Sequence, residues 1–233
     1  MTLSIIIPCY NCENTLEEAV DSIYAQKLDM FFEVVMVDDG STDNSLNIIT
    51  NQNVPLLKLR SLSSNTGPSA ARNIGLTIAK GEYVFFLDAD DTIPTSTLKT
   101  LYSHVKGGDF DLVFSDIQRI EGSKDQNKNI FGHPTDKIYS NSDITEEIKK
   151  RIYDPLFIGG LIGIKGRLIK RSILTRNNLA FEERLRYLED EIFAWDVLAH
   201  CKKAKYIRKQ LYSYYVQPNV SSAVSEGFNR GFS

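Results

Sequence analysis

Residues 81–91 read GEYVFFLDADD, in which a short apolar run leads directly into three carboxylates. The run Tyr83–Leu87 has the unbroken apolar character of a strand that is buried on both faces of a parallel sheet. Two earlier segments have the same form, because Leu3–Pro8 leads into CYN and Phe32–Val37 leads into DDGS. Open parallel sheets bind their ligands outside the carboxyl ends of the strands. The sequence therefore places polar residues where such a sheet would bind a ligand.

Segments with helical spacing of their apolar residues alternate with these strands. This alternation predicts an α/β fold with a mostly parallel, Rossmann-like central sheet flanked by helices. In the first half, helices are expected at Thr15–Gln26, Asp43–Ile49, Ser69–Ala79 and Thr97–Val105, and further strands at Val54–Leu59 and Asp111–Ile120. After a polar stretch at Glu121–Asn141, which we expect to be a surface loop, helices are expected at Ile144–Tyr153 and Glu189–Cys201 and a strand at Lys205–Tyr215.

The composition is that of a packed protein. The 233 residues are 42% apolar and 24% charged, which excludes a disordered chain. No apolar run approaches the ~18 residues that a membrane-spanning helix needs, and the N-terminus lacks the basic region of a signal peptide. These features predict a cytoplasmic protein. The last residues, EGFNRGFS, show no feature that ends a folded unit, which leaves open that the chain continues beyond Ser233.

Charge is divided unevenly along the chain. The net charge is −3, with a balance of −9 in residues 1–144 and +6 in residues 145–233. The overall balance argues against a nucleic-acid partner. An acidic half suits a bound cation, and a basic half suits an anionic ligand or the inner face of a membrane. The alternative is that solvated charges cluster by chance.

Cys9 and Cys12 form a CxxC pair at the end of the first predicted strand. Such a pair can serve in redox chemistry or bind zinc. A zinc site would need a second pair of ligands, for which only His200 and Cys201 are available, and neighbouring helical residues point to different faces. We therefore do not expect these cysteines to carry the function.

Carboxylates follow two of the predicted strands. Asp38 and Asp39 follow one strand, and Asp88, Asp90 and Asp91 follow another. Carboxylates at one sheet edge repel each other unless a cation joins them. Magnesium and manganese are commonly held by one or two carboxylates together with substrate phosphates. The alternative is that these aspartates only cap turns and helices.

The segment 65–75, NTGPSAARNIG, supplies positive potential near the same edge. A helix that starts at Pro68 would point its N-terminus toward the strand ends, and helix N-termini favour anions. Arg72 could donate two hydrogen bonds to a diphosphate, or it could pair with a nearby aspartate. The sequence contains neither the GxGxxG dinucleotide pattern nor the GxxxxGK[ST] phosphate loop.

Five motifs in this order resemble the family 2 glycosyltransferases, which have the GT-A fold. They are IIIPCYN, VDDGSTD, NTGPSAARNIG, GEYVFFLDADD and YLEDE, and the resemblance spans roughly residues 3–215. It implies a nucleotide-sugar donor, usually a UDP-sugar. It also implies a divalent metal, Mn²⁺ or Mg²⁺, and inversion at the anomeric carbon.

The resemblance also assigns donor-binding residues by position. Pro8 and Tyr10 would line the uracil site, with Tyr10 offering a ring face. Asp39 matches the residue that accepts a hydrogen bond from uracil. Asn65 and Arg72 belong to the nucleotide pocket.

The metal and the catalytic residues follow from two further motifs. Asp88-Ala89-Asp90 matches the DxD motif, in which Asp88 would lie toward the ribose and the sugar and Asp90 would hold the metal. Glu189-Asp190 matches a pair whose aspartate is the expected general base. From the residues alone, this pair is also consistent with the acidic first turn of a helix.

Two segments depart from the family pattern. Lys165-Gly166-Arg167-Leu168 stands where relatives often have an aromatic residue followed by Asn-Lys-Leu. Lys165 or Arg167 could contact a diphosphate or an anionic acceptor, or the segment could be a solvated loop. Val216-Gln217-Pro218 stands where an arginine is expected after the YxY motif, so this chain lacks the arginine that would clamp the donor phosphates there.

The sequence as a whole favours an inverting, metal-assisted glycosyltransferase that acts on a glycan or lipid-linked saccharide. Residues 1–120 would bind the nucleotide-sugar and metal, and residues 121–233 would bind the acceptor. The alternative is a non-catalytic nucleotide-sugar-binding module of a longer protein. A nucleotidyltransferase is disfavoured because no glycine-rich basic loop follows the first strand.

Overall fold

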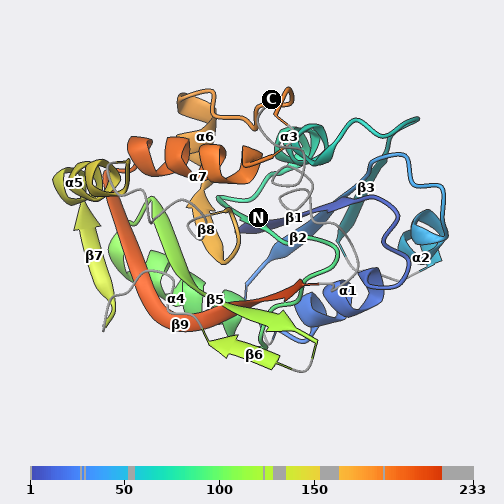
Figure 1. Cartoon of the computed structure of the whole chain (residues 1–233), viewed down its shortest axis with the longest axis horizontal. Coiled ribbons are helices and arrows are strands. Elements are labelled where there is room, and N and C mark those ends of the chain that lie inside the picture. The colour runs from blue at the N-terminus through green and yellow to red at the C-terminus, as the bar shows by residue number, and fades with distance from the viewer. Residues whose placement is uncertain are drawn as a thin grey trace, which may run out of the picture.

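A computed structural model describes residues 2–26, 28, 30–51, 56–122, 124–127, 135–152, 163–185 and 187–216. One sheet runs through both halves of this chain, with strand order β3-β2-β1-β4-β8-β5-β9-β7 and with β6 paired to β5 (Figure 1). The mostly parallel α/β fold predicted from the sequence is confirmed.

Four parallel strands from the first half form one side of the sheet: β1 (Leu3–Cys9), β2 (Phe32–Asp38), β3 (Leu57–Ser61) and β4 (Tyr83–Phe86). Their register aligns Cys9 with Asp38, and Asp38 with Ser61. The residues that follow these strands therefore lie at one edge. In β1, Ile5 and Ile7 pack into one core while Ile6 packs into the other, which explains the unbroken apolar run.

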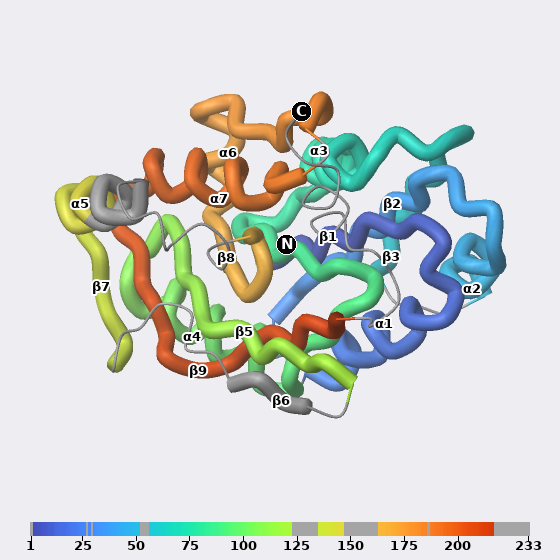
Figure 2. The backbone as a smooth tube through the Cα atoms, in the orientation of Figure 1, coloured from blue at the N-terminus to red at the C-terminus, as the bar shows by residue number. Residues whose placement is uncertain are grey.

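The other side of the sheet mixes directions. β8 (Arg167–Lys170) lies antiparallel between β4 and β5 (Leu112–Glu121), and β5 is parallel to β9 (Lys203–Val216). β7 (Lys137–Ser140) and β6 (Lys124–Asn127) are antiparallel to their partners. Irregular pairing near Asp116 accompanies the curve of β9. Figure 2 follows this strand from the side of α7 to the side of α1.

Helices cover both faces of the sheet. One core contains residues of α1 (Leu16–Tyr24), α2 (Ser45–Asn51) and α4 (Thr97–Gly108). The other contains residues of α3 (Pro68–Ile78), α5 (Asn141–Ile152), α6 (Arg171–Arg176) and α7 (Glu189–His200). Figure 1 shows these two helical layers on opposite sides of the strands.

The structure corrects the prediction of a surface loop at Glu121–Asn141. This segment contains β6 and β7, and β8 and α6 were also missed. Each of these elements has only four to six residues, too few to show a period, and the strands form through pairing with distant partners. Part of the strand predicted at Val54–Leu59 lies outside the described residues, and β3 extends to Ser61. Within the described part of the chain, no helix has the length and apolar character needed to cross a membrane.

Candidate active site

A cavity of about 770 Å³ opens at the carboxyl ends of β1, β2 and β4. The predicted donor-binding residues all line it: Pro8, Tyr10, Asp39, Asn65, Arg72, Asp88, Ala89 and Asp90. The predicted catalytic pair, Glu189 and Asp190, is not among the lining residues, although Glu189 contacts Arg72. The structure thus brings the strand-end residues together. It places the α7 pair outside the cavity lining, with Glu189 in contact with Arg72.

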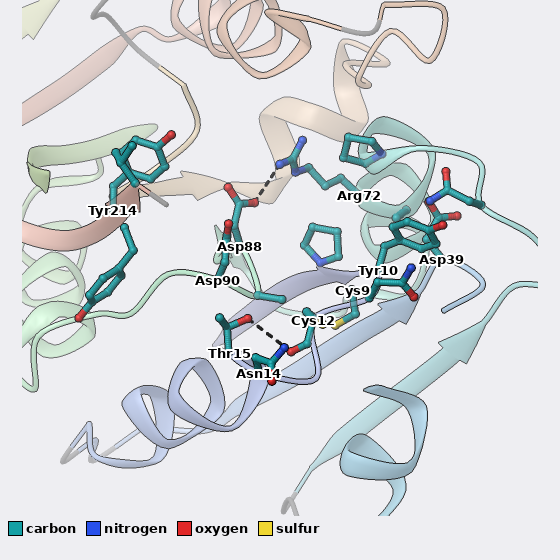
Figure 3. Close-up of a pocket in the computed structure, with 18 of the residues that line it drawn as sticks. Cys9, Tyr10, Cys12, Asn14, Thr15, Asp39, Arg72, Asp88, Asp90 and Tyr214 are labelled. Carbon is teal, nitrogen blue, oxygen red and sulfur yellow. Dashed lines mark hydrogen bonds and ion pairs between the residues drawn. The ribbon is translucent and has the colours of Figure 1, made fainter. Parts of the chain in front are cut away.

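The far wall of the cavity comes from the other side of the sheet, from β5 and β9. It consists of Arg119 and Glu121 at the end of β5 and of Tyr214, Tyr215 and Val216 at the end of β9. In Figure 3, Tyr214 faces Asp88 and Asp90 from the side opposite to Tyr10 and Asp39. The one sequence signal for this wall is the YxY motif, Tyr212-Ser213-Tyr214, after which the family pattern has an arginine. The chain after Val216 lies outside the described residues.

Asp39 organises the segment that leads into α3. Its Oδ1 accepts hydrogen bonds from the Thr66 N–H at 2.8 Å and the Thr66 hydroxyl at 2.7 Å, and its Oδ2 accepts one from the Gly67 N–H at 2.8 Å. The side chain is buried. Since a carboxylate oxygen can accept two hydrogen bonds, Oδ2 retains one acceptor position beyond those bonds.

Tyr10 has a different environment, because it lies at the rim of the cavity and is 47% exposed. The next residue, Asn11, has a φ of 47° and accepts a hydrogen bond from the Thr42 N–H through its Oδ1 at 2.9 Å. The turn after β1 is therefore tied to the turn after β2. This leaves the Tyr10 ring available to a planar ligand.

Arg72 joins two parts of the site. Its Nη2 donates to Asp88 Oδ1 at 2.8 Å, and its Nη1 donates to Glu189 Oε1 at 3.1 Å. The guanidinium also lies 5.4 Å from the centre of the Phe181 ring. Burial disfavours its charge, but the carboxylates of Asp88, Asp190 and Glu189 outweigh this and raise the pKa of Arg72. Its Nε is buried without a hydrogen-bond partner in the described residues.

Three carboxylates, those of Asp88, Asp90 and Asp91, lie together with ligand atoms within 4.8 Å of one another. Asp91 is fully buried and accepts hydrogen bonds from the Tyr212 hydroxyl at 2.8 Å and the Tyr215 N–H at 3.0 Å. Burial and the neighbouring carboxylates raise its pKa to about 6. Asp91 therefore fixes β9 against the end of β4, while Asp90 faces the cavity.

Lys165 adds a cation to this cluster. The sequence did not predict its contacts with Asp88 and Asp91. Its Nζ donates to Asp91 Oδ2 at 2.6 Å and forms a second ion pair with Asp88. The solvated loop considered for this segment is not observed, because the Lys165 side chain is only 16% exposed and Arg167 is buried. Arg167 Nε instead donates to the Gly163 carbonyl at 2.7 Å.

The residues present fit a hard divalent cation, because the donors are carboxylate oxygens. Within the described chain Asp90 has no ion pair or side-chain hydrogen bond to another residue, whereas both oxygens of Asp88 are engaged by Arg72 and Lys165. Desolvation within the cavity and the charge of Asp88 raise the pKa of Asp90, although the residue itself is exposed. Asp90 is thus the most available ligand.

The cysteines line the cavity without joining a metal cluster. Cys9 is buried and Cys12 is half-buried, and both are free thiols. Among the described residues, the carboxylates above form the only group of three potential ligands. Cys201 is buried elsewhere, where its thiol donates to the Val197 carbonyl.

Glu189 and Asp190 begin α7. The preceding residue, Leu188, has a φ of 61°, which turns the chain into the helix. Asp190 Oδ1 accepts a hydrogen bond from the Glu191 N–H at 2.9 Å. Asp190 Oδ2 lies so close to Gly163 that a Cβ added to this glycine would be 2.3 Å from it. Burial and the charge of Asp190 raise the pKa of Glu189. The pair thus lies between Arg72 and the loop that carries Lys165.

This fold and cavity define an α/β protein whose site collects carboxylates and a buried arginine at the carboxyl ends of a parallel sheet. The model of glycosyl transferase family 2 matches residues 4–171, and the chain belongs to this family.

Named relatives and solved structures agree with this membership. The chain is 30% identical to a poly(ribitol-phosphate) beta-glucosyltransferase of Bacillus spizizenii, over 93% of this chain and 32% of that protein. It is also 30% identical to the poly(ribitol-phosphate) beta-N-acetylglucosaminyltransferase TarP of Staphylococcus aureus, over 93% of this chain and 63% of TarP. The structure of S. aureus TarS in complex with UDP-GlcNAc superposes with a TM-score of 0.78 at 26% identity, covering 94% of this chain and 60% of that one. The chain thus spans less than two thirds of each of these relatives.

Proposed function

We propose that this chain transfers a sugar from a UDP-sugar to a saccharide acceptor, with inversion and with assistance from a divalent metal. One observation carries the proposal: eight residues assigned to the donor by sequence position lie around a single cavity at the strand ends. The family and the TarS complexes with UDP and UDP-GlcNAc support the choice of donor.

The donor would lie along the edge of β2, β1 and β4. Uracil would stack on Tyr10 and donate to the free acceptor position of Asp39, with Pro8 and Asn65 beside the nucleoside. The diphosphate would then reach Ala89 and Arg72, whose buried Nε has no hydrogen-bond partner in the described residues. A charge-assisted bond at this nitrogen would favour an anionic ligand over a neutral one.

Asp90, assisted by Asp88, would hold the metal. When bound, Mn²⁺ or Mg²⁺ neutralises charge that builds up on the leaving diphosphate. Asp88 is paired with Arg72 and Lys165 in the free protein, and it would orient the sugar end of the donor.

Asp190 would act as the general base. It would take the proton of the acceptor hydroxyl as that oxygen bonds to the anomeric carbon and the bond to UDP breaks. Glu189 is held by Arg72, so it would position the start of α7. This arrangement assigns the donor-binding residues to residues 1–120 and acceptor binding to residues 121–233, although the far wall of the cavity also comes from the second part.

The basic balance of the second half favours an anionic acceptor or contact with an anionic membrane surface. The relatives named as poly(ribitol-phosphate) transferases would use anionic acceptors. The acceptor class is therefore expected to include phosphate-bearing or lipid-linked saccharides.

The test is UDP release from a panel of UDP-sugars with Mn²⁺, with and without candidate acceptors. An enzyme releases UDP at a rate that depends on the acceptor. A non-catalytic module would bind UDP-sugar yet release no UDP with any acceptor, and that result would replace the proposal by the binding-module alternative.

A further inference from the structure

Lys165 lies where the chain departs from the aromatic-Asn-Lys-Leu pattern of its relatives. Its ammonium group pairs with Asp88 and Asp91. It also lies 5.3 Å from the centre of the Tyr212 ring and 4.7 Å from that of Tyr214. The position is thus enclosed by two carboxylates and two aromatic rings, which together favour a cation.

The backbone around Lys165 holds it in this position. Gly166 has a φ of 68°, which disfavours other residues, and a Cβ there would lie 3.0 Å from Ser115 Oγ. The next residue, Arg167, is buried and begins β8 between β4 and β5. Gly166 and Arg167 fix the turn on the C-terminal side of Lys165 and present the lysine to the carboxylates, so the ion pairs are not a chance surface contact.

These contacts limit the carboxylate oxygens that are available to a metal. Asp88 Oδ1 is bonded to Arg72 and Asp88 Oδ2 to Lys165, while Asp91 is bonded to Lys165, Tyr212 and Tyr215. Of the three carboxylates, only Asp90 lacks such a partner within the described chain. A metal that used Asp88 as a second ligand would have to take an oxygen from Lys165 and lie close to its ammonium group.

We propose that Lys165 is a built-in counter-ion that competes with the divalent metal for Asp88. This inference rests on the proposed function of the site. In the free protein, Lys165 keeps metal affinity low, because two like charges would share one carboxylate. The nucleotide diphosphate adds negative charge and oxygen ligands, so the metal binds mainly together with the donor. Lys165 is thus a positioning residue.

The test measures Mn²⁺ affinity of the nucleotide-free protein by electron paramagnetic resonance of free Mn²⁺. Lys165→Met should tighten Mn²⁺ binding about tenfold or more, because it frees Asp88 and removes a positive charge within a few ångströms. Lys165→Arg should restore weak binding. Lys170→Met is the matched control, since Lys170 pairs with Asp109 away from the cavity.

A second comparison covers the case in which Lys165→Met fails to fold, because it leaves Asp91 buried without its cation. The double variant Lys165→Met/Asp91→Asn removes both charges, and it should bind Mn²⁺ about tenfold or more tightly than Asp91→Asn alone. Unchanged or weaker Mn²⁺ binding in these comparisons would overturn the inference.

Calorimetric titration with UDP separates this inference from the proposed function. If the wild-type protein binds UDP and Lys165→Met leaves Mn²⁺ affinity unchanged, only the role of Lys165 is wrong. If the wild-type protein does not bind UDP, the proposed function fails as well.

Discussion

Arg72 connects the cavity to the first turn of α7. Its bonds to Asp88 and Glu189 place one guanidinium between the strand-end carboxylates and the expected catalytic pair. The sequence left two readings of this residue, a diphosphate ligand or an ion-pair partner. The structure shows the ion pairs. Because Arg72 Nε has no hydrogen-bond partner among the described residues, the diphosphate contact stays a prediction for the donor-bound state.

Asp39→Ala tests nucleotide selection. Loss of a charge-assisted hydrogen bond, worth about 1.5–3 kcal/mol, should raise the dissociation constant for UDP about tenfold or more. Because Asp39 also binds Thr66 and Gly67, the variant will lose stability. Thr66→Val is the matched control: it removes the hydroxyl bond to Asp39 and should leave UDP affinity nearly unchanged. Equal UDP affinity in Asp39→Ala and wild type, by calorimetry, would count against the assignment.

Asp190→Asn tests the general base. The amide keeps the shape of the side chain but cannot take a proton, so turnover should fall by about 10²–10⁴. UDP-sugar binding should be nearly unchanged, because Asp190 is not among the residues that line the cavity. Steady-state turnover and donor affinity are measured on the same preparation. Normal turnover, or a parallel loss of donor binding, would place the base elsewhere.

At the scale of elements, the sequence predicts the strands that are buried on both faces, because their apolar runs are unbroken. It also predicts that the polar residues after these strands lie together, because parallel strands end at one edge of the sheet. It does not predict β8 or the position of Lys165. RLIK is too short to show a period, and its strand character comes from pairing with β4 and β5. Lys165 meets Asp91 across 74 residues of sequence. Only the tertiary fold brings such groups together.

Gly75→Ala tests how closely α3 packs on the sheet. A Cβ at Gly75 would lie 2.4 Å from Ile6 Cγ2, so the helix or the Ile6 side chain must shift. Overpacking typically costs about 1–3 kcal/mol of unfolding free energy. Gly107→Ala in α4 is the matched control, because a Cβ there meets nothing within 4 Å. That change should be neutral or stabilising by up to about 1 kcal/mol. Equal stabilities of the two variants in urea unfolding would contradict this packing.

At the scale of the whole molecule, the two proposed halves are interleaved. β8 comes from the second half and lies between β4 and β5 of the first. The uneven charge of the sequence therefore does not mark two separable folding units. The functional division into donor and acceptor halves stays a prediction about ligands.

Glu33 links several segments at the end of the sheet opposite to the cavity. It accepts hydrogen bonds from the Ser4 hydroxyl and the Lys80 N–H, both at 2.6 Å, and pairs with Lys58. Burial opposes its ionisation, but these donors together lower the pKa of Glu33. A lowered folded-state pKa stabilises the protein above the ordinary glutamate pKa of about 4.3. That contribution is lost as the pH falls through the folded-state value.

Glu33→Gln should therefore lower the unfolding free energy at pH 7 by about 1–3 kcal/mol. The difference from wild type should shrink as the pH falls below about 4.3. Urea unfolding of both proteins between neutral and acidic pH measures this. A difference that stays constant across that range would show that the Glu33 charge does not contribute.

Calorimetric titration of UDP, with Mn²⁺ or with excess EDTA, measures whether this cavity binds UDP together with a metal held by Asp90. Wild-type protein should bind UDP several kcal/mol more favourably with Mn²⁺, since the ion joins the carboxylate to the diphosphate. Asp90→Ala should lose this difference, while Asp109→Ala, an exposed aspartate paired with Lys170, should keep it. UDP binding that is equal with Mn²⁺ and with EDTA in the wild-type protein, or a metal effect that survives in Asp90→Ala, would contradict the account.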